Sequence, residues 1–445
     1  MVRCDRSRRI LQLGEDAKHQ HAAGHLASAE LDEFGNHQAM PLYLGLDAGV
    51  HGLNAIVIEI EGERRRVVFN RTINFDRDLP SYGTSGGLRR TAEGDLPASP
   101  VMWADALERM LGRLAAAAEI EVERIRAVAA AAHHADGPLH QHLPDWAALN
   151  PSIALPAQLK AESPIARRFD SLGAYFEALI AGPDLRLSSY WRQRFALPAA
   201  AIVLWTGDQA ARAIGTGVIR DGIVAISLGV TDTLIASASA SATGTSSITF
   251  RNGSLVRDAV RMQYRLDWDE VARLLEQSPG NDGALMLPWL ERETIPSIAH
   301  AGVRRFGFDR HDPGRNVRGV IEGQMMAMAN HVQLRGRAAV EKVIATGPDA
   351  ANRAILQVMA NVFGAEVYRL DGEHSVALGA ALRAYHADRL SAGEPVSWKT
   401  VVSGFTDPQP GYRVSPTPRH VALYAALRKD YALLERLHKD RAPIC

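Results

Sequence analysis

The sequence has few cysteines, no net charge and no long apolar run. Its two cysteines, Cys4 and Cys445, stand at the extreme ends of 445 residues, which excludes a disulfide framework and a cysteine-based zinc site and favours a reducing compartment. Fifty basic residues balance fifty acidic ones, so no electrostatic argument points to a nucleic-acid or membrane partner. No apolar run approaches the roughly 18 to 20 residues that span a bilayer. We therefore expect a soluble, cytoplasmic protein.

The length of the chain predicts two domains, because a single hydrophobic core rarely extends over 445 residues. Residues 1–39 differ from the rest in combining four arginines and several histidines with Ala, Glu and Asp. We expect them to form a poorly ordered extension, with Met40 as a candidate start of the folded chain. The pattern of strands and helices then predicts one domain over 40–215 and a second over 216–445.

Strands, a hairpin and helices follow one another twice along the chain, once from residue 42 and once from residue 222. The expected strands of the first half are 42–47, 53–60, 65–73 and 124–132, with an amphipathic helix that begins at Ser99-Pro100. In the second half, we expect residues 246–258 to form two strands about an Asn252-Gly253 turn. The later elements are helices at 266–276 and 320–332, strands at 343–346 and 366–370, and helices at 375–387 and 422–437. This order predicts an α/β protein with two similar halves around a cleft.

The stretch from Ile202 to Leu234 contains two apolar runs that each end in chemically useful residues. The first run ends at Thr206-Gly207 and places Asp208 at the start of an Ala-rich helix. The second opens into the small-residue turn Gly229–Thr233. A carboxylate that accepts a proton and a Gly/Thr loop that offers backbone N–H groups to phosphate oxygens suit phosphoryl transfer. A helix-capping aspartate and an ordinary turn are the structural alternatives.

These stretches and several others resemble the FGGY family of carbohydrate kinases, and most closely its xylulose kinases of the eukaryotic type. The matching segments cover both halves in the family's order: INFDRDLPSYGTSGG (73–87), SPVMWADALERML (99–111), TGDQAA (206–211), SLGVTDTLIA (227–236), FRNGSLVRDAVR (250–261), VIEGQMMAMANH (320–331) and the block 345–387. The resemblance implies two ribonuclease-H-like domains of the actin/Hsp70-like ATPase type around a nucleotide cleft, with the first domain shortened. It also implies transfer of the γ-phosphoryl group of ATP to a ketose, in these relatives to the 5-hydroxyl of D-xylulose.

The resemblance also implies roles for individual residues. Asp208 stands where the family has its catalytic base, which would orient the sugar hydroxyl and accept its proton. Asp47, with Gly49, stands in the first phosphate loop, where a carboxylate supports Mg²⁺. The second phosphate loop corresponds to Gly229, Thr231 and Thr233, and the adenosine motif to Gly347 and Asn352.

The sugar motif of the family corresponds to His133 and His134, so these two residues and Asp208 are expected to contact the sugar. His140 and His142 lie close by in the sequence, which makes a metal site conceivable because imidazoles are common ligands. No carboxylate or cysteine accompanies these histidines in a fixed pattern. A solvated loop is therefore the favoured interpretation.

Four positions depart from the family's pattern. Val50 and Asn54 replace a threonine and a lysine in the first phosphate loop, Val230 replaces a threonine in the second, and Pro348 replaces a glycine in the adenosine motif. Each lost phosphate hydrogen bond or charge costs about 1 to 3 kcal/mol. Two hypotheses stay open: an active kinase that uses ATP and Mg²⁺, and a weak or inactive homologue that regulates by binding a sugar or a nucleotide. The expected partner is a small sugar, and both a monomer and a homodimer remain possible.

Overall fold

The computed structural model describes residues 40–91, 94–96, 100–132, 186–187, 189–237, 245–333, 339–372, 374–407 and 410–441. The chain divides into two compact units, 1–39 and 40–445, and the second contains everything described below. The extension predicted at 1–39 and a helix predicted at 172–180 lie outside the described residues. Within those residues, no helix combines the length and the apolar character that crossing a membrane requires.

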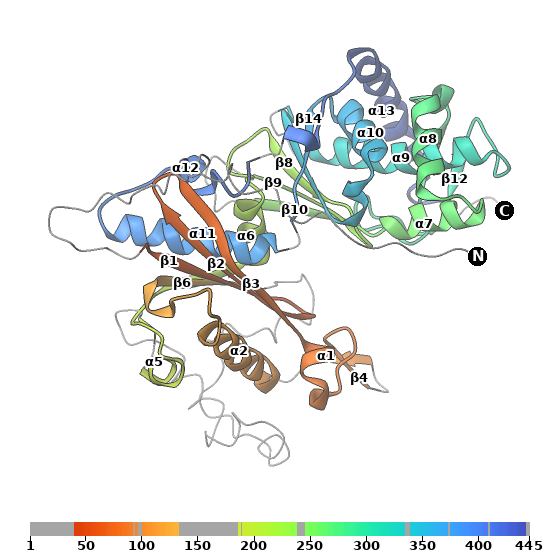
Figure 1. Ribbon diagram of the computed structural model, residues 1–445. Coiled ribbons are helices and arrows are strands. Elements are labelled where there is room, and N and C mark those ends of the chain that lie inside the picture. Colours follow the sequence, from red (N-terminus) through yellow and green to blue (C-terminus); the bar gives the residue numbers. More distant parts are fainter. Residues whose placement is uncertain are drawn as a thin grey trace, which may run out of the picture. The chain divides into compact units, whose positions relative to one another are not determined.

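The first half is built on a five-stranded sheet in the order β3-β2-β1-β6-β7 (Figure 1). Its strands are β1 (Leu42–Ala48), β2 (Gly52–Glu61), β3 (Arg64–Asn74), β6 (Ile125–Ala132) and β7 (Ala201–Gly207). The first three strands form an antiparallel meander, and β6 and β7 run parallel to β1. The strands predicted at 42–47 and 124–132 and the hairpin predicted from 53–60 and 65–73 are therefore confirmed.

Helices cover both faces of this sheet. Helix α2 (Pro100–Ala115) packs against β2 and β3, where Met102, Ala106 and Met110 on its apolar face are buried. Helix α11 (Ser375–Ser391) packs against β1, β2 and β6. Because both faces are covered, the central strands are apolar along almost their whole length rather than alternating with polar residues.

The second half repeats this topology in a six-stranded sheet of order β10-β9-β8-β13-β14-β15. Its strands are β8 (Ile223–Ser227), β9 (Asp232–Ser237), β10 (Thr245–Phe250), β13 (Lys342–Thr346), β14 (Glu366–Arg369) and β15 (Arg413–Val414). Strands β8 to β10 again form an antiparallel meander, and β13 and β14 run parallel to β8. The internal repeat predicted from the sequence is therefore present in the strand order.

The main helices of the second half enclose a single large apolar cluster. They are α7 (Ser254–Gln263), α8 (Trp268–Gln277), α9 (Pro313–Gln333), α10 (Arg353–Phe363) and α13 (Pro418–His438). Met325 and Met328 of α9 are buried in this cluster. Helix α8 begins with a capping box between Asp267 and Glu270, which explains its sharp start.

Helix α6 (Asp208–Gly215) crosses α11 at very short range. A Cβ on Gly379 would lie 1.8 Å from the Ala211 carbonyl oxygen, and a Cβ on Gly215 would lie 1.8 Å from the Ser375 carbonyl oxygen. Only glycine permits two backbones to approach so closely. This crossing fixes the helix that carries Asp208 at its first position.

The hairpin predicted at 246–258 is wrong. Strand β10 ends at Phe250, and the Asn252-Gly253 pair leads into α7 instead of a returning strand. A Cβ on Gly253 would lie 2.5 Å from the Gly229 carbonyl oxygen, and Ser254 donates its N–H to that same oxygen at 2.7 Å. The glycine therefore serves a close backbone approach, not a turn between strands.

Candidate active site

Asp47 and Asp208 lie at the same edge of the first sheet. In the strand register, Asp47 of β1 lies opposite Ala131 of β6, and Ala131 lies opposite Thr206 of β7. Asp208 follows two residues later, at the start of α6. Strands pair about 4.8 Å apart, so β1 and β7 are separated by about 10 Å across β6. The carboxyl ends of parallel strands in α/β proteins are the usual location of ligands.

Asp208 is the first residue of α6 and is 6% exposed. The N-terminal end of a helix stabilises a negative charge through its backbone dipoles. One turn further along, Arg212 places a guanidinium nitrogen 3.6 Å from the Asp208 carboxylate. The carboxylate is therefore fixed at the start of a helix and lies close to a cation, an arrangement that suits a group which accepts a proton.

Asp47 is oriented by a relay of two polar side chains. The Asn54 amide donates to the Asp47 carboxylate at 3.0 Å, across the β1–β2 pair. The Thr72 hydroxyl in turn donates to the amide oxygen of Asn54 at 2.7 Å. Because Thr72 occupies the amide oxygen, the amide NH₂ group of Asn54 faces Asp47.

A magnesium ion that arrives with a nucleotide fits this carboxylate better than a resident metal does. Mg²⁺ keeps several water ligands and needs one or two carboxylates beside the substrate phosphates. Asp47 offers such a carboxylate. Among the residues that the structure describes, no three His, Cys, Asp or Glu side chains gather into a metal-binding group.

The segment 80–88 packs against the loop that follows Asp47. A Cβ on Gly87 would lie 1.9 Å from the Val50 carbonyl oxygen, and the His51 ring contacts the Gly86 carbonyl oxygen at 2.7 Å. The Asp76 carboxylate accepts the N–H groups of Gly86 and Gly87. The polar groups around it, the Thr84 hydroxyl foremost and then these backbone N–H groups, lower the pKa of the Asp76 carboxyl. The first loop is closed on itself by the N–H of Gly49, which donates to Gly52.

The two predicted nucleotide loops meet at one edge of the second sheet. Strands β8 and β13 pair in parallel, and the Leu228 N–H donates to the Thr346 carbonyl at 2.9 Å just beyond the strand ends. Gly229 follows one strand and Gly347 the other. Gly347 has φ +89°, and a Cβ there would lie 2.3 Å from the Leu228 carbonyl oxygen. Glycine is therefore required at this position both for its backbone conformation and for the close contact.

The remaining predicted nucleotide residues are placed by these loops. Thr231 is exposed at the tip, Thr233 lies in β9, and the Val230 side chain between them is 62% exposed. Asn352 caps α10, where its amide oxygen accepts the N–H groups of Ala354 and Ile355. Pro348 occupies the first position of a 3₁₀ turn, η5 (Pro348–Ala351), where its fixed φ and missing N–H are tolerated.

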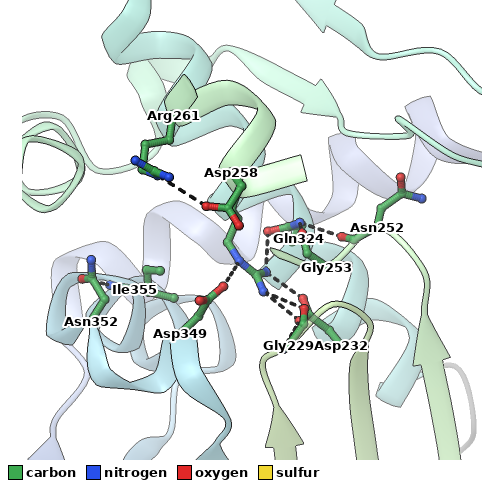
Figure 2. A network of polar contacts seen from close by, with 11 residues as sticks. Gly229, Asp232, Asn252, Gly253, Asp258, Arg261, Gln324, Asp349, Asn352 and Ile355 are labelled. Atoms are coloured by element: carbon green, nitrogen blue, oxygen red, sulfur yellow. Dashed lines mark hydrogen bonds and ion pairs between the residues drawn. The ribbon is translucent and has the colours of Figure 1, made fainter. Parts of the chain in front are cut away.

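One network at this edge could not be found from the sequence pattern. Arg257 of α7 has no exposed side-chain surface and binds Asp232, Asp349 and Gln324 (Figure 2). Sequence reasoning missed it because residues 246–258 are predicted as a hairpin, whereas Arg257 lies in α7. The available signal was Asp232, a charged residue directly after the Gly/Thr loop.

The structure brings the predicted site residues together as two groups. One edge holds Asp47, Gly49 and Asp208, and the other holds Gly229, Thr231, Thr233, Gly347 and Asn352. His133 and His134, the predicted sugar contacts, lie outside the described residues, as do His140 and His142. The predicted sugar contacts therefore stay predictions.

Comparison with known proteins identifies the second of these groups. Residues 229–387 match the C-terminal domain of the FGGY family of carbohydrate kinases. The chain carries an FGGY kinase domain. This FGGY domain contains both nucleotide loops and the Arg257 network, and the predicted family resemblance is confirmed.

The relatives of this chain include two curated mammalian proteins. It is 34% identical over 285 residues to the xylulose kinase of Rattus norvegicus, an alignment that covers 58% of this chain and 52% of the relative. It is 32% identical over 275 residues to the xylulose kinase of Mus musculus, covering 56% of this chain and 49% of the relative. The chain thus spans about half the length of these curated relatives.

Solved structures resemble this chain over most of its length. The gluconate kinase of Lactobacillus acidophilus superimposes with a TM-score of 0.66 at 15% identity, covering 90% of this chain and 98% of that one. A xylulose kinase from the same organism gives 0.64 at 15% identity, covering 89% and 98%. At such identities the likeness establishes the fold, and it confirms the predicted actin/Hsp70-like arrangement of the kinases.

Proposed function

We propose that this protein is an ATP-dependent carbohydrate kinase that transfers the γ-phosphoryl group to a ketose hydroxyl. The observation that carries the proposal is the placement of Asp47 and Asp208 at one edge of the first sheet, Asp47 on β1 and Asp208 directly after β7, the two strands that flank β6. The FGGY match over 229–387 supports the same activity from the other half of the chain. We further propose that 40–215 binds mainly the sugar and that 216–445 binds the nucleotide.

Each residue group has a separate task in this reaction. Asp208 orients the sugar hydroxyl and accepts its proton while the oxygen–phosphorus bond forms and ADP departs. Asp47 holds the side of the site where Mg²⁺, when bound with ATP, neutralises phosphate charge. The loops at Gly229 and Gly347 cradle the nucleotide with backbone N–H groups, since a Gly-rich turn lets the backbone approach phosphate oxygens.

We propose D-xylulose as the substrate, with D-xylulose 5-phosphate as the product. The rat and mouse relatives, both named xylulose kinases, support this choice over other ketoses. His133, His134 and Asp208 are the proposed sugar contacts. A panel of pentuloses and hexuloses tests the choice, and D-xylulose should have the highest kcat/KM.

A coupled assay of ADP release tests the activity itself. The protein with MgATP should release ADP in a manner that depends on the sugar, and calorimetric titration should show tighter MgATP binding when D-xylulose is present. An Asp208→Asn variant provides the matched background, because it retains shape and hydrogen bonding without the carboxylate. Sugar-dependent turnover no higher than in this variant would overturn the proposal.

A further inference from the structure

Arg257 is a buried cation whose side chain reaches two separate loops of the FGGY domain. It donates two hydrogen bonds of 2.8 Å to the two oxygens of Asp232. Its Nε–H donates to Asp349 at 2.7 Å, and Nη1 also donates to the Gln324 side-chain oxygen at 2.9 Å. Figure 2 labels the three side chains that accept these hydrogen bonds, Asp232, Asp349 and Gln324.

The two acids belong to the two proposed nucleotide loops. Asp232 starts β9 directly after the turn that begins at Gly229, and Asp349 lies in η5, two residues after Gly347. The guanidinium therefore connects the phosphate loop, residues 229–233, to the nucleoside loop, residues 347–352, through charged hydrogen bonds. Gln324 of α9 adds a support, because its amide nitrogen donates to the carbonyls of Asn252 and Gly253 at the entry to α7.

No N–H group of Arg257 remains for a phosphate. A guanidinium has five N–H donors, and the acceptors are one oxygen of Asp349, two of Asp232, one of Gln324 and, at 3.5 Å, the Gly229 carbonyl. Arg257 therefore differs from an arginine that binds substrate phosphate directly. Its effect on a nucleotide has to pass through the loops that it holds.

The same network determines which backbone groups of the phosphate loop can bind a ligand. The Gly229 N–H donates to Asp232 at 3.1 Å and is therefore occupied. The N–H groups of Val230 and Thr231 form no hydrogen bond with any residue that the structure describes. The ion pair with Arg257 thus fixes a loop in which these two N–H groups are left for phosphate oxygens.

We propose that Arg257 is a positioning residue that locks the phosphate loop and the nucleoside loop at a fixed separation before the nucleotide binds. The inference rests on the proposed function in taking the ligand of the two loops to be ATP. Groups held in advance in the binding geometry lose less freedom on association, so the lock strengthens nucleotide binding. Val230 and Thr231, rather than Gly229, then supply the phosphate-binding N–H groups.

An Asp349→Ala variant removes the bond between Arg257 and the nucleoside loop, while the buried pair of Arg257 and Asp232 stays intact. We expect the KM for ATP to rise about 10-fold as pre-organisation is lost, while the KM for sugar stays within about twofold. Asp349→Asn keeps an acceptor for Nε–H and should recover part of the loss. Asp221→Ala, which removes an exposed carboxylate from the same half, is the control and should leave both constants unchanged.

Hydrogen–deuterium exchange tests whether Arg257 holds the two loops in place, and it needs neither nucleotide nor turnover. In the ligand-free protein, Asp349→Ala should speed amide exchange in both 229–233 and 347–352, and Asp221→Ala in neither. Unchanged amide exchange together with an unchanged KM for ATP in a folded Asp349→Ala variant would overturn the inference. An equal rise in the KM for ATP and in the KM for sugar would overturn it as well. If the unmodified protein binds no MgATP, the proposed function fails, while the exchange experiment still decides whether the lock exists.

Discussion

The side-chain amide of Asn54 donates a 3.0 Å hydrogen bond to the carboxylate of Asp47, and the Thr72 hydroxyl orients that amide. A neutral donor thus stands beside this carboxylate in place of the lysine that the family resemblance leads one to expect. The Asn54 amide orients the carboxylate without placing a positive charge of its own beside it. The departure at Asn54 is therefore compatible with a role of Asp47 in supporting Mg²⁺.

Replacing Asn54 by alanine tests this role of the amide. Groups that orient a metal-supporting carboxylate affect metal affinity strongly, so we expect the half-saturating Mg²⁺ concentration to rise about 10-fold. Thr72→Val should give a smaller change in the same direction, because it releases the amide without removing it. Asn70→Ala, an exposed site on β3, is the control, and an Mg²⁺ dependence equal in all variants would contradict the role.

A Val230→Thr substitution should improve the use of ATP. The side chain is 62% exposed at the tip of the phosphate loop, so the change should not disturb folding. A hydroxyl there can add one hydrogen bond to a phosphate oxygen, which corresponds to a rise of about 3- to 10-fold in kcat/KM for ATP. Val67→Thr, at a 45% exposed position on β3, is the matched control. Equal kcat/KM in both variants would show that the hydroxyl has no phosphate to bind.

The close crossing of α6 and α11 makes Gly379 sensitive to a single methyl group. Alanine there would place its Cβ 1.8 Å from the Ala211 carbonyl oxygen, so the helices must separate. We expect Gly379→Ala to lower the free energy of unfolding by about 2 to 4 kcal/mol. At Gly411 a Cβ would meet no atom within 4 Å, and Gly411→Ala should change stability by less than about 0.5 kcal/mol. Similar denaturant midpoints for the two variants would refute the crossing.

Glu322 of α9 should make stability depend on pH. It is almost fully buried, and burial raises the pKa of its carboxyl from 4.5 to about 7, although Tyr424 and the Gly280 N–H donate hydrogen bonds to it. Between these two values the unfolded chain releases a proton that the folded chain retains. The contribution of Glu322 to the free energy of unfolding is therefore fully present below pH 4.5. It falls by about 3 kcal/mol in total as the pH rises through 7.

Glu322→Gln keeps the acceptor for Tyr424 and removes the titration. Between pH 5 and pH 7, the unfolding free energy of the variant should therefore decline less than that of the unmodified protein. The measurement compares denaturant unfolding of both proteins across that range. Parallel pH profiles would show that Glu322 does not retain its proton in the fold.

Most of the fold could be predicted because its signals are local. The apolar runs at 42–47, 53–60 and 343–346 form strands where expected, since strands covered on both faces are apolar along most of their length. The repetition of strands and helices along the chain also predicted two similar halves, although it did not predict their sheet order. The Asn252-Gly253 pair led to the wrong prediction of a hairpin. Its glycine serves a close contact with a part of the chain distant in sequence, the carbonyl of Gly229.

The site was predictable where the chain places chemistry at the end of a strand or just after it. Asp47, Asp208, Gly229 and Gly347 all follow this rule. The Arg257 network does not, because a buried ion pair forms between residues 25 and 92 positions apart. No periodicity separates Arg257 from an exposed arginine, and only the three-dimensional packing of α7 and α9 reveals it.

The most direct measurement is the sugar-dependent rate of ADP release by the Asp208→Asn variant, compared with the unmodified protein at saturating MgATP and D-xylulose. Loss of the general base should lower kcat by about 10²- to 10⁴-fold, while calorimetry shows nucleotide and sugar binding within about twofold of the unmodified protein. An equal kcat in the two proteins would contradict the assignment of Asp208 as the base, and with it the proposed sugar kinase mechanism.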